Sequence, residues 1–161
     1  MLKPKAYLDS VLQLTPEWMR ARGLEAMLVD LDNTLVPYGY EGSPSPELLA
    51  WVLRLKEAGI GIYLVSNARR GRLRRWARML GVEGAGLAGK PWFGFRGGLK
   101  KLGLSPSQVA AVGDQVFTDV LGGNLLGLYT VLVKPISQDE LAYTRMVRRL
   151  ERLVLGRSNT R

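Results

Sequence analysis

The sequence contains neither cysteine nor histidine. A chain without cysteine forms no disulfides and no thiolate metal sites, which is consistent with a reducing cytoplasm. A chain without histidine lacks the commonest general base and the usual zinc ligand. Any hydrolytic chemistry must therefore use carboxylates, lysine, serine or tyrosine together with a metal bound through oxygen, and Mg²⁺ suits such a site.

Long apolar runs are also absent. No stretch approaches the roughly 20 apolar residues that a membrane-spanning helix needs. The first residues, Met1 to Lys5, are not followed by the apolar core of a signal peptide. We therefore expect a cytoplasmic protein that is soluble or peripheral at the inner membrane surface.

Acidic residues are few relative to basic ones. The chain has 14 Asp and Glu against 23 Lys and Arg, which gives a net charge of +9. A surplus of this size attracts polyanions, namely nucleic acid, an anionic membrane surface or a phosphorylated substrate. The charge alone does not choose among these partners.

The 161 residues, 47% of them hydrophobic, suffice for one domain with its own core. Short apolar runs alternate with amphipathic stretches, which predicts an α/β fold: a Rossmann-like three-layer sandwich around a mostly parallel sheet of about five strands. We expect a core over about residues 26–134, an N-terminal extension over 1–25 and a C-terminal helix over about 138–155. The predicted strands are 26–29, 60–65, a short edge strand within 82–87, 109–112 and 129–133; the other predicted helices are 45–58, 69–80, 91–102 and 116–126, with a single turn at 105–108.

Three of these strands end in polar side chains. Asp30 and Asp32 follow the first strand, Ser66 and Asn67 the second, and Asp114 the fourth. In an open parallel sheet, ligands bind beyond the carboxyl ends of the strands, near the point where the strand order reverses. Residues that are far apart in the sequence should therefore meet in one crevice.

The spacing of Asp30 and Asp32 suits covalent hydrolysis of a phosphate ester. Both carboxylates can face the crevice while Leu31 packs back against the sheet. Asp30 would attack phosphorus, and Asp32 would give a proton to the leaving oxygen and then take one from the attacking water. The alternative is an ordinary turn, a setting in which Asp and Asn are common.

Two further elements could hold a phosphate group. Ser66 offers a hydroxyl, and Asn67 offers a backbone amide beside it at a helix N-terminus, although a simple helix cap has the same residues. Lys90 lies in a tight loop before a helix, where its ammonium could neutralise phosphate and steady the nucleophile. Most lysines, however, are only solvated surface residues.

Gly113, Asp114 and Asp119 complete the set of candidates. Gly113 allows close approach of the backbone, and Asp114 should lie at the same sheet edge as Asp30. Several carboxylates in one crevice require a cation, and Mg²⁺ takes one or two carboxylates, a carbonyl and waters. Asp119 could hold water, metal or Lys90. Alternatively, it could be an ordinary first-turn aspartate that interacts favourably with the helix dipole.

In this order, the motifs resemble those of the haloacid dehalogenase superfamily over about residues 26–133. The family pattern is Asp-x-Asp-x-Thr, then Ser, then Lys, then Gly-Asp with a spaced second Asp, and it is carried here by Asp30, Asp32, Thr34, Ser66, Lys90, Gly113, Asp114 and Asp119. The resemblance implies that the backbone carbonyl of Asp32 joins the side chains of Asp30 and Asp114 around Mg²⁺. It also implies phosphatase chemistry, because the dehalogenase members lack the second aspartate.

The intervals between these motifs leave room for only one helix each with short loops. We therefore expect none of the cap domains that other members of the superfamily insert there. An open site excludes water poorly unless the substrate or a partner covers it. Large substrates such as lipid head groups, proteins or nucleic-acid ends are favoured over small metabolites.

Nearly the whole chain resembles the capless, subclass IIIA, YqeG-type family, which is related to mitochondrial phosphatidylglycerophosphate phosphatase. The matching segments are 15–17, 30–36, 65–67, 90–91, 113–124 and 130–135. Ala68 and Leu125 depart from the pattern, at positions where Asn and Arg are usual. The resemblance implies phosphatidylglycerophosphate as the substrate. A phosphatase of nucleic-acid ends or phosphoproteins, and a non-enzymatic nucleic-acid-binding or assembly factor, stay open as alternatives, with nucleic acid the less expected partner.

The segment 69–80 carries six arginines, while Leu73, Trp76, Ala77 and Leu80 share one helical face. Such a helix can lie on anionic head groups, which would give peripheral contact with a membrane. The alternative is an amphipathic helix that packs its apolar face on the sheet. In that case the arginines form an electrostatic surface.

Overall fold

The structure is a computed structural model, and it describes residues 2–86 and 93–136. The side chains of Phe117 and Thr118 are outside this description. The elements, in chain order, are β1 (Ala6–Leu8), η1 (Val11–Gln13), α1 (Pro16–Arg20), β2 (Ala26–Val29), α2 (Pro46–Glu57), β3 (Gly61–Val65), α3 (Arg70–Leu80), β4 (Glu83–Ala85), α4 (Phe93–Leu102), η2 (Pro106–Gln108), β5 (Val109–Gly113), η3 (Val116–Val120), α5 (Leu121–Leu125) and β6 (Tyr129–Val133).

The six strands form one sheet in the order β1-β6-β5-β2-β3-β4, and every neighbouring pair is parallel. This arrangement confirms the predicted α/β class and the five predicted strands. The sixth strand, β1, was not predicted. Its three residues are too few to show a hydrophobic period, and it becomes a strand because it pairs with β6, with Tyr7 opposite Leu132.

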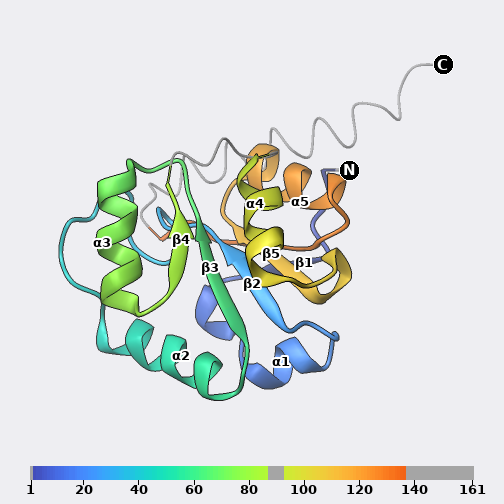
Figure 1. Ribbon diagram of the computed structural model, residues 1–161, viewed down its shortest axis with the longest axis horizontal. Coiled ribbons are helices and arrows are strands. Elements are labelled where there is room, and N and C mark those ends of the chain that lie inside the picture. The colour runs from blue at the N-terminus through green and yellow to red at the C-terminus, as the bar shows by residue number, and fades with distance from the viewer. Residues whose placement is uncertain (1, 87–92, 137–161) are drawn as a thin grey trace.

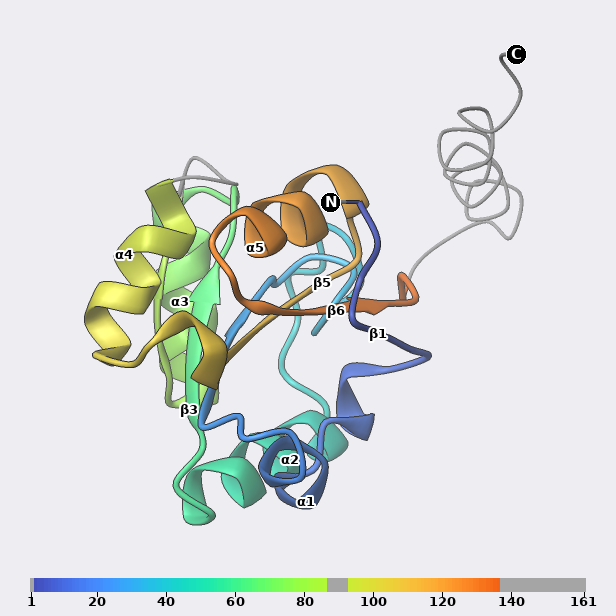
Figure 2. The ribbon, with the colours of Figure 1, turned by 90° about the vertical axis from the view of Figure 1, so that its right-hand side faces the viewer.

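Helices cover both faces of the sheet, as Figure 1 and Figure 2 show. Successive residues of β2 point to opposite faces. Met27 and Val29 belong to the larger core, together with residues of α1, α2 and α3. Ala26 and Leu28 belong to a second core that includes Phe95 of α4. The molecule is therefore the predicted three-layer sandwich, with both faces of its central strands buried.

The predicted helix ends are largely confirmed. The Ser45 side chain accepts a hydrogen bond from the Leu48 N–H at 3.1 Å, and Pro46 occupies the first position of α2. Helix α3 ends at Gly81, whose φ of 68° is left-handed. The apolar face of α3 is buried on the sheet, so the packing alternative for this helix is the correct one.

The segment predicted as one helix over 116–126 is divided in two. A π-helical turn, η3, comes first, and the short helix α5 follows it. The extra residue of a π turn widens the helix locally. Asp119 lies in this wide turn, and its side chain reaches back to the N–H of Gln115 at 3.1 Å.

The sheet order positions the site. From β2 the chain proceeds through β3 to β4 on one side, and it returns to β5 and β6 on the other. The strand order therefore reverses at β2, where a ligand crevice is expected. Only α2 separates β2 from β3, and within the described residues α3 is the helix between β3 and β4, so no cap domain is present there. Lys90 and the predicted helix over 138–155 lie outside the described residues.

Candidate active site

A cavity of about 240 Å³ opens beyond the carboxyl ends of β2, β3 and β5. All five polar residues that were predicted to converge contribute to its wall. The lining residues are Asp30, Asp32, Asn33, Tyr38, Ser66, Asn67, Ala68, Asp114 and Gln115.

Asp30 is fixed at the floor of this cavity. Its N–H donates to the carbonyl of Val112 at 3.0 Å, which extends the pairing of β2 with β5 by one residue. Its carboxylate accepts a hydrogen bond from the N–H of Leu31 at 2.8 Å. The residue is only 8% exposed, so its carboxylate has little freedom and a defined direction.

The chain turns sharply after Asp32. Asn33 has a φ of 59°, a left-handed conformation that Asn tolerates better than most residues. The Asn33 N–H donates to the Val36 carbonyl at 2.7 Å. Thr34 is buried, and its hydroxyl has no hydrogen-bond partner among the described residues. The turn thereby keeps Asp30 and Asp32 on the cavity side of the loop.

Three buried carboxylates gather beside the cavity. One oxygen each from Asp30, Asp114 and Asp119 lies within 4.8 Å of the others. Placing like charges this close is unfavourable unless a cation is shared among them. Carboxylate oxygens are the ligands that hard divalent cations prefer. The three residues therefore form a candidate site for a divalent metal ion.

Gly113 makes room for this cluster. A Cβ atom at this position would lie 2.1 Å from Cγ of Asp119. Real Cβ contacts are never this short, so any side chain at position 113 would displace the Asp119 carboxylate. From the sequence, Asp119 had several possible roles, among them that of a metal ligand; the structure places its carboxylate beside those of Asp30 and Asp114.

Replacing Gly113 with alanine should destabilise the fold by about 1–3 kcal/mol, because the new methyl overpacks a buried site. Because Asp119 must move, a divalent cation bound at this site should stabilise the variant less than the wild-type chain. Gly97→Ala is the matched control, because a Cβ there meets no atom within 4 Å. Thermal unfolding with and without Mg²⁺ measures both effects; equal melting curves for the two variants would contradict this account.

Asp32 is held by two hydrogen bonds. Its Oδ1 accepts from the N–H of Gly39 at 2.9 Å, and its Oδ2 accepts from a terminal nitrogen of Arg72 at 2.8 Å. The Asp32 and Arg72 side chains are 20% and 14% exposed, respectively, so this ion pair is partly shielded from water. Asp32 thus lines the cavity but lies outside the cluster of three carboxylates.

The loop after Asp32 is fastened to α3 by arginines. Arg72 also donates to Glu41 at 3.2 Å and to the carbonyl of Tyr40 at 3.0 Å. Arg75 donates to the Glu41 carboxylate at 3.0 Å and to its carbonyl at 2.6 Å. The ring of Tyr40 lies 6.0 Å from that of Trp76. This loop forms one wall of the site and is tied to α3.

Of Ser66 and Asn67, which were predicted to bind phosphate, Ser66 is the buried residue. It is 2% exposed, and its hydroxyl accepts the N–H of Ala68 at 3.1 Å. Asn67 is exposed at the cavity. Of the two departures from the family pattern, Ala68 lines the cavity, while Leu125 is an exposed residue of α5.

A model of the haloacid dehalogenase-like hydrolases matches residues 15–127. The chain belongs to this family. The match spans β2, β3 and β5 and therefore every described residue of the site. The family match, together with the buried cluster of Asp30, Asp114 and Asp119, identifies the protein as a phosphatase of the haloacid dehalogenase type that acts on a phosphorylated substrate.

Two curated relatives agree with this family membership. The YqeG protein of Bacillus subtilis, named a probable phosphatase, is 33% identical over 154 residues, covering 95% of this chain and 89% of that one. A chloroplastic and mitochondrial phosphatidylglycerophosphate phosphatase of Arabidopsis thaliana is 44% identical over 59 residues, but these cover 36% of this chain and 17% of that one.

A solved structure shares the haloacid dehalogenase fold. It is the 3-deoxy-D-manno-octulosonate 8-phosphate phosphatase of Moraxella catarrhalis, determined in complex with a magnesium ion, a phosphate ion and KDO. The TM-score is 0.58 and the identity 19%, with 86% of this chain and 90% of that one covered. At this identity the likeness establishes the fold alone.

Sequence reasoning missed Arg72, as well as Tyr38 and Gln115 of the cavity wall. Arg72 was one of six arginines in an amphipathic segment, and nothing in its spacing distinguishes it from the other five. Its contact with Asp32 joins residues that are 40 positions apart. Only the packing of α3 beside the loop brings the two side chains together.

Proposed function

We propose that this phosphatase is Mg²⁺-dependent and that it hydrolyses the phosphomonoester of phosphatidylglycerophosphate through an aspartyl-phosphate on Asp30. The observation that carries the proposal is the buried cluster of Asp30, Asp114 and Asp119, which adjoins a cavity lined by a further carboxylate, Asp32. A nucleophile, an acid and a cation site are the three components that this reaction needs.

Mg²⁺ would be held by the side chains of Asp30 and Asp114, by the backbone carbonyl of Asp32 and by Asp119, directly or through water. When bound, it supplies positive charge for the phosphate oxygens and offsets the repulsion among the carboxylates. The donor set is all oxygen, and the chain has no His or Cys that would favour zinc.

The reaction has two steps. An oxygen of Asp30 forms a bond to phosphorus while the bond to the leaving oxygen breaks, and Asp32 gives its proton to that oxygen. Asp32, now ionised, then takes a proton from water, which attacks the phosphorus and releases inorganic phosphate from Asp30. Ser66, Asn67 and Lys90 would bind the phosphate oxygens throughout.

Three observations support a lipid substrate. The partial relative from Arabidopsis is named a phosphatidylglycerophosphate phosphatase. The net charge of +9 favours contact with an anionic membrane surface. No cap stands over the described site, which leaves space for a large substrate. Among the described residues, no helix is both long and apolar enough to cross a bilayer, so such contact would be peripheral.

A substrate panel tests this assignment. Vesicles that contain phosphatidylglycerophosphate should be hydrolysed with a kcat/KM at least about tenfold above that for 3′- or 5′-phosphorylated oligonucleotides and phosphopeptides, a difference of about 1.4 kcal/mol in transition-state binding. Inorganic phosphate release in the presence of Mg²⁺ is the measurement. A preference for oligonucleotides would replace the lipid assignment with that of a phosphatase acting on nucleic-acid ends.

A further inference from the structure

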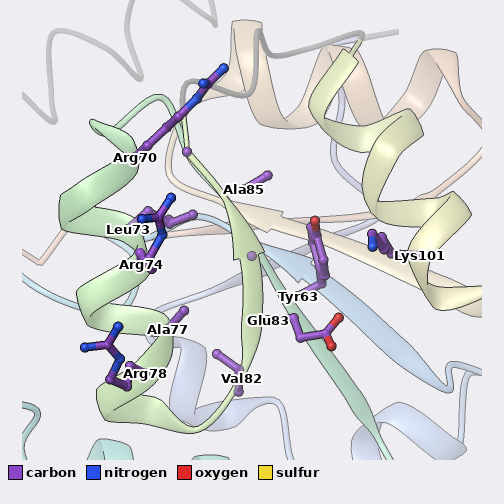
Figure 3. A pocket seen from close by; sticks show the side chains of 12 residues that line it. Tyr63, Arg70, Leu73, Arg74, Ala77, Arg78, Val82, Glu83, Ala85 and Lys101 are labelled. Carbon is purple, nitrogen blue, oxygen red and sulfur yellow. The ribbon is translucent and has the colours of Figure 1, made fainter.

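A second and larger groove, of about 660 Å³, lies beside α3 and along the edge strand β4 (Figure 3). Helix α3 forms one wall, and Tyr63 of β3 with Lys101 of α4 forms the other. The groove shares no lining residue with the catalytic cavity. Its function is therefore a separate question.

The α3 wall carries a row of positive charge. Arg70, Arg74 and Arg78 follow one another at intervals of four residues, and Figure 3 shows them along the same side of the helix. All three are exposed. The ion pairs found among the described residues use Arg72 and Arg75 instead, so this row has no acidic partner there. Three unneutralised guanidinium groups in a groove favour an anionic ligand.

The floor of the groove is an unpaired sheet edge. Strand β4 pairs with β3 on one side only, with Gly84 opposite Leu64. Along its other side, no strand of the described chain meets it. The N–H and C=O groups of an edge strand are a template to which an extended segment can add.

The spacing of the arginines matches an added strand. Four residues of an α-helix rise about 6 Å, and two residues of a β-strand rise about 6.6 Å. Side chains at alternate positions of a strand point to the same face. Three acidic residues at alternate positions would therefore face Arg70, Arg74 and Arg78 in register, while the strand backbone pairs with β4.

We propose that this groove binds an acidic, extended segment of a partner protein, which adds to β4 as a seventh strand and places acidic side chains at alternate positions against Arg70, Arg74 and Arg78. On the opposite side the charges are mixed, because Glu83 points toward the wall that holds Lys101 (Figure 3). Only the α3 wall is uniformly positive, which favours this one-sided acidic pattern over a uniform polyanion. A flat membrane surface cannot pair with the backbone of β4.

A strand in this groove would lie beside the catalytic cavity. Gly86, at the end of the groove, is so close to Ala68 that a Cβ on it would lie 2.8 Å from the Ala68 carbonyl oxygen, and Ala68 lines the cavity. A partner bound here could therefore cover part of a site that has no cap. The proposal does not depend on which phosphate ester the enzyme hydrolyses.

The test uses the full chain and an acetylated, amidated peptide in which Glu alternates with Thr and Val. Calorimetry at low salt should show one-to-one binding, and NMR should show shifted amide signals for Glu83, Gly84 and Ala85. Arg74→Glu should weaken binding by about tenfold or more, since it replaces attraction with repulsion. Arg54→Glu, the same change at an exposed residue of α2, should leave the affinity unchanged.

Two further controls complete the test. A peptide of the same composition with contiguous Glu residues should bind about tenfold more weakly, because its charges lose the register with α3. Hydrolysis of p-nitrophenyl phosphate should be unchanged in Arg74→Glu, which shows that the variant is folded. The proposal is overturned if both peptides bind equally or if neither binds. Weaker binding of Arg74→Glu to phosphatidylglycerol vesicles or to single-stranded oligonucleotides would then assign the three arginines to a membrane surface or to nucleic acid.

Discussion

Replacement of Asp30 by asparagine should reduce phosphate release by about 10⁴-fold or more, as is typical when the nucleophile of a covalent mechanism is removed. The amide cannot form the acyl phosphate, and its nitrogen is no ligand for a divalent cation. Because Asn has nearly the same size as Asp, the packing of this buried position should be retained. Both the turnover and the covalent intermediate should therefore disappear together.

The intermediate can be measured directly. Acid quenching during turnover, followed by mass spectrometry, should find one phosphoryl group on the wild-type chain and none on Asp30→Asn. Asp9→Asn, the same change at an exposed residue that does not line the cavity, is the control for the charge alteration. Circular dichroism and thermal unfolding confirm that both variants are folded. A variant of Asp30 that kept more than about a tenth of the activity would show that another group is the nucleophile.

The sequence predicted the architecture where burial is strongest. Strands β2, β3 and β5 are continuous apolar runs because both of their faces are covered by helices. Each run ends in a polar residue at the carboxyl edge, and in a parallel sheet these ends must lie together. The convergence of Asp30, Ser66 and Asp114 on one cavity therefore followed from the pattern and the topology alone.

What the sequence left open depends on contacts between distant residues. Strand β1 exists through its pairing with β6, and its three residues carry no pattern of their own. Asp119 approaches Asp30 and Asp114 from the π-helical turn η3, which the sequence pattern did not predict. Arg72 is one arginine among six until α3 packs beside the loop after Asp32.

Asp32→Asn should lower turnover by about 10²–10⁴-fold, the usual contribution of a general acid and base. An asparagine can neither protonate the leaving oxygen nor accept a proton from water. Unlike Asp30→Asn, this variant keeps the nucleophile, so it should still form some phosphoenzyme with an activated substrate such as p-nitrophenyl phosphate, whose leaving group needs little protonation. Rapid-quench measurement of phosphoenzyme separates the two aspartates.

Arg72 should control when Asp32 can act. In the structure both oxygens of Asp32 accept hydrogen bonds, from Gly39 and from Arg72. When Asp32 carries the proton that it donates as an acid, its carboxyl group is neutral and the ion-pair attraction to the Arg72 guanidinium is lost. We therefore expect the contact with Arg72 to open for the first step and to close again for the second, when Asp32 is the base.

Arg72→Met should consequently slow hydrolysis of the phosphoenzyme, lowering turnover by about tenfold and raising the fraction of enzyme trapped with phosphate. Arg75→Met is the matched control, because Arg75 fastens the same loop through Glu41 without touching Asp32. In the Asp32→Asn background, Arg72→Met should have almost no further effect, since a residue that acts through another cannot act without it. If the effects of the two substitutions multiply instead, Arg72 acts through the loop and not through Asp32.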